Sequence, residues 1–101
     1  MTNVILSADG DSKVYSVPDE VAENLSRHCN YFRTTWLRIS RHAKKYRLPG
    51  GVVCYNEEDF IEYLNKWKYP DQPSVLVDNL GWIGHECEIP EQYRICPRFN
   101  F

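Results

Sequence analysis

The stretch from Pro18 to Tyr46 constrains the fold more than any other part of this sequence. On an α-helix, at about 100° per residue, its apolar side chains fall within one narrow stripe. The stripe consists of Val21, Leu25, Cys29, Phe32, Trp36, Ile39, Ala43 and Tyr46. Proline suits the first helical turn, and Asp19 and Glu20 complement the helix dipole there. The sequence therefore predicts one long amphipathic helix over residues 18–46 that packs through this stripe.

The predicted helix has a clear end and one position at which it can divide. The segment Leu48-Pro49-Gly50-Gly51 stops it, because proline lacks an N–H group and glycine favours non-helical turns. Ser40 is a residue type that caps helix N-termini. A break at Ser40, with a second and shorter helix after it, therefore stays open.

Basic residues occupy the side of the predicted helix opposite the apolar stripe. This basic ridge consists of Arg27, Arg38, Arg41 and Lys45, with Arg33, Lys44 and Arg47 on one flank. No Asp or Glu occurs from Asn24 to Asn56, so the ridge lacks neighbouring acids that would relieve repulsion between like charges. It is either a solvated helix face or a surface that binds an anionic partner. Its five Arg against two Lys favour bidentate contacts to phosphate or carboxylate groups.

The rest of the pattern predicts a single α+β domain over residues 1–101, with both helices on one face of a small sheet. Four segments have strand patterns: residues 3–8 and 13–17, which form a hairpin, and residues 52–55 and 74–78. The 52–55 run is continuously apolar and therefore predicts an interior strand. The aromatic content of 14% supplies large side chains for a core.

A second, shorter helix is predicted after Asn56, which has the spacing of a capping box with Asp59. Its apolar face consists of Phe60, Tyr63, Leu64 and Trp67. Residues 69–73, with two prolines, end this helix. Residues 90–93 suit a helical turn, and we expect an extended tail over 96–101 that its two phenylalanines hold in place.

Acidic residues gather at the start of this second helix. They are Glu57, Glu58, Asp59 and Glu62. Such a cluster either complements the helix dipole or imitates the charge of a nucleic acid. A mimic of nucleic acid needs more acid than the net charge of −2 supplies, so helix capping is the favoured interpretation.

The cysteines and histidines form no recognisable metal or catalytic motif. The four cysteines are Cys29, Cys54, Cys87 and Cys96, without a Cys-x-x-Cys pair, and we expect reduced thiols. A zinc site that draws ligands from His28-Cys29 and His85-Glu86-Cys87, with Cys54 or Cys96 completing four, fits the usual ligand spacing poorly. A nucleophilic site from Cys87, His85 and Glu86 would need adjacent loop residues to converge on one reacting atom. We therefore predict no metal, no cofactor and no catalytic activity.

Several segments carry a resemblance to a known group of proteins. They are Val4–Gly10, Val14–Pro18 with Val21-Ala22, Ala43–Arg47, Val53–Glu57, Asp59–Asn65 and Cys96–Phe101. Together they resemble small proteins of bacterial phages and mobile elements, a group that includes anti-CRISPR inhibitors of Cas9. The resemblance implies a non-catalytic inhibitor that folds and binds. The N-terminus lacks the features of a signal peptide and no window is apolar enough to span a bilayer, so we expect the cytoplasm of a bacterial host.

Two functions are therefore expected. The first is an anti-CRISPR protein that binds a type II CRISPR effector, or its guide RNA or target DNA, and blocks its activity. The second is a nucleic-acid-binding regulator of a phage or mobile element. Tyr31 lies near the basic ridge and can stack on a base, but Thr34, Thr35 and Leu37 offer no second aromatic platform. This favours contacts to phosphate or protein, and no membrane or small-molecule substrate is indicated.

Overall fold

The chain begins with the predicted hairpin, which lies at the centre of the sheet. In the computed structural model, which describes residues 1–101, β1 (Thr2–Ser7) and β2 (Ser12–Val17) pair antiparallel, with Val4 opposite Tyr15. Alternate residues point to opposite faces of a strand. Val4, Leu6, Tyr15 and Val17 are buried on one face of the hairpin, and Ile5 and Val14 on the other. Both faces of the hairpin are therefore covered.

Two further strands extend the hairpin to a four-stranded mixed sheet with the order β3-β2-β1-β4. The strand β3 (Val75–Gly81) pairs antiparallel with β2, with irregular register at two places. The strand β4 (Arg98–Asn100) pairs parallel with β1. The expected extended tail is thus confirmed, and Phe99 and Phe101 pack against the core as predicted.

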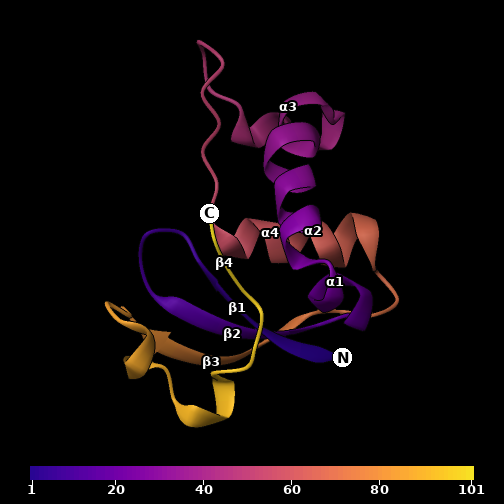
Figure 1. Ribbon diagram of the computed structural model, residues 1–101. Coiled ribbons are helices and arrows are strands. Elements are labelled where there is room, and N and C mark those ends of the chain that lie inside the picture. Colours follow the sequence, from indigo (N-terminus) through magenta and orange to yellow (C-terminus); the bar gives the residue numbers. More distant parts are fainter.

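The two faces of the sheet are covered in different ways, as Figure 1 shows. The helices lie on one face, which confirms the predicted α+β class. The segment from residue 82 to 97 lies on the other face, where Ile89 and Tyr93 pack against Ile5 and Val14. This segment contains two short 3₁₀ turns, Glu86–Glu88 and Glu91–Tyr93, and the second lies where a helical turn was predicted.

The prediction of one long basic helix over residues 18–46 is wrong, because the stretch divides twice. The helix α1 (Asp19–Glu23) ends at Asn24, whose side-chain amide donates a hydrogen bond to the carbonyl of Glu20 and competes with the helical backbone. A continuous helix of 15 residues follows. It comprises α2 (Leu25–Tyr31), a π-helical segment (Phe32–Trp36) and α3 (Leu37–Ile39).

The break at Ser40 that the sequence left open is confirmed. Ser40 has an extended backbone (ψ 136°), and its hydroxyl accepts a hydrogen bond of 3.1 Å from the backbone N–H of His42. This contact caps a 3₁₀-helix over Arg41–Tyr46. The polypeptide therefore changes helical geometry in the middle of the basic ridge.

The π-helical segment changes which side chains of the stretch are buried. The N–H of Leu37 donates to the carbonyl of Phe32, five residues earlier, so this turn holds one residue more than an α-turn. The side chains after this turn are therefore rotated relative to those of an ideal α-helix, and the buried face of the helix shifts with them. Leu37 is fully buried, whereas Ile39, which the periodicity placed in the stripe, is 73% exposed.

The interior strand predicted at residues 52–55 is also wrong. This segment makes a single bridge, between Arg47 and Val53, and Val52 is 55% exposed. Gly50 and Gly51 both have positive φ angles, which reverse the chain into a loop. Figure 1 shows this loop extending away from the sheet, so no strand is available to pair with it.

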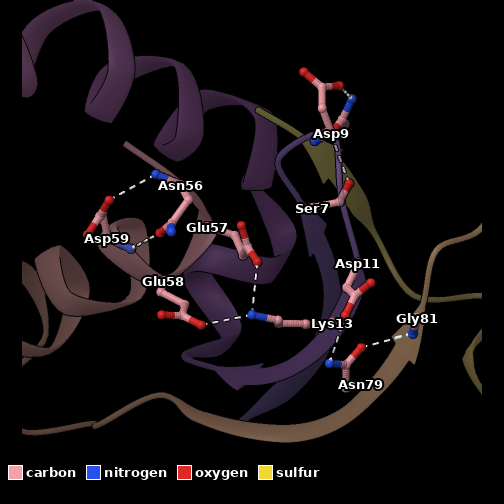
Figure 2. A network of polar contacts seen from close by, with 11 residues as sticks. Ser7, Asp9, Asp11, Lys13, Asn56, Glu57, Glu58, Asp59, Asn79 and Gly81 are labelled. Carbon is pink, nitrogen blue, oxygen red and sulfur yellow. Dashed lines mark hydrogen bonds and ion pairs between the residues drawn. The ribbon is translucent and has the colours of Figure 1, made fainter. Parts of the chain in front are cut away.

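The second helix begins as predicted. The capping box of Asn56 and Asp59 is present, and α4 (Glu57–Tyr63) continues into a π-helical segment (Leu64–Lys68). Figure 2 shows Lys13 of β2 reaching this helix start, with its ammonium 3.2 Å from a Glu57 oxygen and 2.8 Å from one of Glu58. The acidic cluster therefore also ties α4 to the hairpin, beyond the capping that was predicted. No helix of the structure combines the length and apolar character that a bilayer crossing requires.

We expect Phe32→Ala to lower the free energy of unfolding by about 3–5 kcal/mol, because removal of a fully buried ring leaves a cavity. Ile39→Ala serves as the matched control from the same helix, and truncation of its exposed side chain should cost less than about 0.5 kcal/mol. Urea denaturation of both variants measures the difference. Equal decreases in stability would contradict the displaced register of the buried face.

Candidate nucleic-acid interface

The structure gives the seven residues of the basic ridge three different roles. Arg47 is structural: its guanidinium donates hydrogen bonds to the carbonyls of Leu37 (3.1 Å) and Ser40 (2.8 Å). Leu37 lies in the last turn of the 15-residue helix and Ser40 directly follows that helix, and the Ser40 carbonyl also accepts the backbone N–H of Ala43 at 3.1 Å. Arg47 therefore closes that helix end and is not free to bind a partner through the same donors.

Arg33 is also held within the fold. Its Nε donates to the side-chain oxygen of Asn30 at 3.1 Å, and its guanidinium lies 5.3 Å from the ring centre of Phe99. The contact with Phe99 is a cation–π interaction between the helix layer and β4. Arg33 is half-buried as a result.

Arg27 and Lys45 are exposed but paired with acids from outside the acid-free stretch. Arg27 lies 3.5 Å from Glu20, and Lys45 lies 3.0 Å from Glu62. The interpretation that the ridge has no acid to pair with is therefore wrong for these two positions. The partners come from the preceding helix and from α4, which sequence spacing on one helix does not reveal.

Three cations of the ridge remain exposed and make no ion pair or side-chain hydrogen bond within the chain. They are Arg38, Arg41 and Lys44, which we call the free cations. Arg41 and Lys44 are one turn apart in the 3₁₀-helix and so lie on the same side of it, and Arg38 lies in α3, just before the break at Ser40. They are the part of the predicted ridge that stays available to an anion.

The 3₁₀-helix sorts its side chains by its period of three residues. Ala43 and Tyr46 are buried in the core. One position earlier, His42 and Lys45 turn toward the second helix, where they contact Trp67 and Glu62. The remaining row, Arg41 and Lys44, is left exposed to solvent.

Trp67 is the residue that the sequence interpretation missed. It was assigned to the apolar face of the second helix, yet it is 47% exposed and stacks on His42, with ring centres 3.9 Å apart and planes 17° from parallel. The π-helical segment explains why Trp67 is exposed instead of sharing the buried face of Phe60. The N–H of Tyr69 donates to the carbonyl of Leu64, five residues earlier, so the face of Trp67 is displaced from that of Phe60. No pattern in the sequence indicates this exposure, because buried positions such as Tyr46 are also flanked by basic residues.

Glu62 holds the 3₁₀-helix against the second helix. One carboxylate oxygen accepts hydrogen bonds from Lys45 (3.0 Å) and Lys66 (2.7 Å), and the other lies 3.3 Å from the hydroxyl of Tyr46. The two ammonium groups lower the pKa of Glu62 to about 2. This ion-pair cluster links the two elements that carry His42 and Trp67.

Among the residues considered for metal binding or catalysis, His28, Cys29 and Glu86 are buried or paired within the fold. His28 is buried and binds Glu20 at 2.6 Å, and burial raises the pKa of the Cys29 thiol. The His85 Nδ1 lies 3.1 Å from the Cys87 sulfur, but Glu86, the third member considered, pairs with Arg98. No group of three or more His, Cys, Asp or Glu residues is arranged to hold a metal ion.

No protein family, curated protein or solved structure matches this chain.

We expect Glu62→Gln to lower the melting temperature at neutral pH. The folded-state pKa of Glu62 is depressed from 4.5 to about 2, so its ion pairs stabilise the fold above about pH 4.5 and lose their effect as the pH falls toward 2. The melting temperatures of the wild type and this variant should therefore converge across that range. Glu23→Gln, a change at an exposed glutamate without a partner, is the control. A difference that persists unchanged at pH 2 would contradict the assigned role of the ion pairs.

Proposed function

We propose that this chain is a non-catalytic protein that binds nucleic acid through Arg38, Arg41 and Lys44. In this proposal it inhibits a type II CRISPR effector by occupying the guide RNA or the target DNA. The proposal rests on one observation: the basic ridge contains residues that are used within the fold and residues that are left free. Four of its residues are used within the fold, whereas these three are exposed and have no partner in the chain.

Phosphate groups fit the free cations best. Like charges that stay close without acids between them raise the energy of the folded protein, and an anionic partner reverses this effect. The two arginines can each form bidentate contacts with a phosphate, which are stronger than neutral hydrogen bonds. The net charge of the chain is −2, so attraction to a polyanion depends on the local free cations and not on the charge of the whole chain.

The proposed biological setting comes from the resemblance to phage and mobile-element proteins. A type II effector holds an RNA–DNA duplex and a displaced single strand in positively charged channels. A small protein with its own cationic surface can compete with the effector for these strands in the bacterial cytoplasm. A regulator of a mobile element would use the same cations on its own nucleic acid, and the inhibition assay below separates the two.

We expect the double variant R38Q/R41Q to bind nucleic acid at least about tenfold more weakly than the wild type. Its affinity should also decrease less steeply with salt, by about 0.7–0.9 in log–log slope for each phosphate that the variant no longer neutralises. The double variant Q72E/Q92E is the matched control, because it changes the net charge by the same two units at exposed sites elsewhere. Titration of a labelled oligonucleotide at several salt concentrations measures both quantities.

The same variants test inhibition in a Cas9 cleavage assay. Loss of inhibition in R38Q/R41Q, with inhibition retained in Q72E/Q92E, would support the inhibitor proposal. Nucleic-acid binding without any inhibition would favour the regulator. Wild-type binding by R38Q/R41Q would contradict both. Nuclease-resistant copurification with the effector and a shallow salt slope would indicate an acidic protein surface as the partner instead.

A further inference from the structure

We infer that the nucleic acid bound here is single-stranded and that one of its unpaired bases stacks on the His42–Trp67 pair. This inference rests on the proposed function, because it names the form of nucleic acid that the same surface takes. The two rings belong to the 3₁₀-helix and to the π-helical segment after α4, which lie far apart in the sequence. The fold alone brings them together beside the free cations.

The geometry of the two rings is that of an aromatic platform. Their centres lie 3.9 Å apart and their planes deviate by 17° from parallel. Both residues are exposed, so part of their ring surface is accessible to solvent. A base adds to such a stack as a further layer, because every base has a flat π-face.

Cations lie beside both rings along the chain. Arg41 and Lys44 flank His42 in the 3₁₀-helix, and the exposed Lys68, which makes no ion pair, follows Trp67. An aromatic platform combined with a cationic track is how proteins hold single strands without reading their sequence. A duplex offers the same phosphates, but its bases are covered by their neighbours and cannot reach a ring on the protein surface.

The platform is already formed before binding. Glu62 bridges Lys45 and Lys66, so the 3₁₀-helix and the second helix are held together directly beside the ring pair. Ala43 and Tyr46 anchor the 3₁₀-helix in the core from the other side. Binding a base therefore requires little ordering of the protein, which favours affinity.

The other exposed tryptophan has a different environment and supplies a control. Trp82 is 70% exposed and follows β3. It begins the segment over residues 82–97, which lies on the face of the sheet away from the helices. It is followed closely by Glu86 and Glu88 rather than by cations. A base that needed only an exposed indole would bind at Trp82 as readily as at Trp67.

The test compares a labelled single strand of about ten nucleotides, of uniform pyrimidine sequence, with a duplex of the same length. We expect Trp67→Ala to weaken binding of the single strand at least about fivefold and to leave binding of the duplex unchanged. Trp67→Phe, which keeps an aromatic ring, should weaken binding of the single strand less than Trp67→Ala does, and Trp82→Ala should keep wild-type affinity. Circular dichroism and melting curves confirm that each variant is folded.

Photochemical crosslinking tests the same inference without any substitution. A strand that carries 5-bromouracil should crosslink to the peptide that contains Trp67 or His42. Crosslinks confined to Trp82 or Tyr31 would overturn the inference, as would wild-type binding of the single strand by Trp67→Ala. If R38Q/R41Q weakens binding but Trp67→Ala does not, nucleic-acid binding stands and the stacking platform is wrong. If neither change weakens binding, the proposed function fails as well.

Discussion

The fold depends on the burial of Phe32, whose ring is the meeting point of the helices, the loop and the C-terminus. It is completely buried, and its centre lies within about 6 Å of five other aromatic rings. These rings belong to Trp36, Tyr55, Phe60, Tyr63 and Phe101. Aromatic pairs at such distances contribute beyond the burial of their apolar area. One side chain thus connects the 15-residue helix to α4 and to the chain end that follows β4.

The candidate interface takes its shape from this core. Trp36, which stacks on Phe32, also contacts Tyr46 of the 3₁₀-helix, with ring centres 6.3 Å apart. Tyr46 and Ala43 fix the inner side of the 3₁₀-helix, and the Glu62 ion pairs fix its flank. The row that remains, Arg41 and Lys44, can therefore face outward only. Arg41 and Lys44 are therefore exposed because their neighbours in the 3₁₀-helix are buried in the core or paired with the second helix.

Two π-helical segments influence which side chains leave the core. Each adds one residue to a turn and rotates the following side chains relative to an ideal α-helix. In the 15-residue helix, the π-helical segment makes Leu37 the buried residue instead of Ile39. In the helix that begins with α4, the π-helical segment leaves Trp67 exposed. Such segments are frequent at functional sites in helices. Here both adjoin the surface that carries the free cations.

Features with a local physical cause could be predicted from the order of residues alone, and features that depend on packing could not. The hairpin, the capping box of Asn56 and Asp59, the cap at Ser40 and the extended tail each depend on a few neighbouring residues. The predictions that failed assumed an ideal helical period across residues 18–46, or a partner strand for residues 52–55. Which cations are free was settled in three dimensions, because Glu62 reaches Lys45 from a distant helix and Trp67 meets His42 across two elements. Charges can be counted along a sequence, whereas their pairing depends on distance in space.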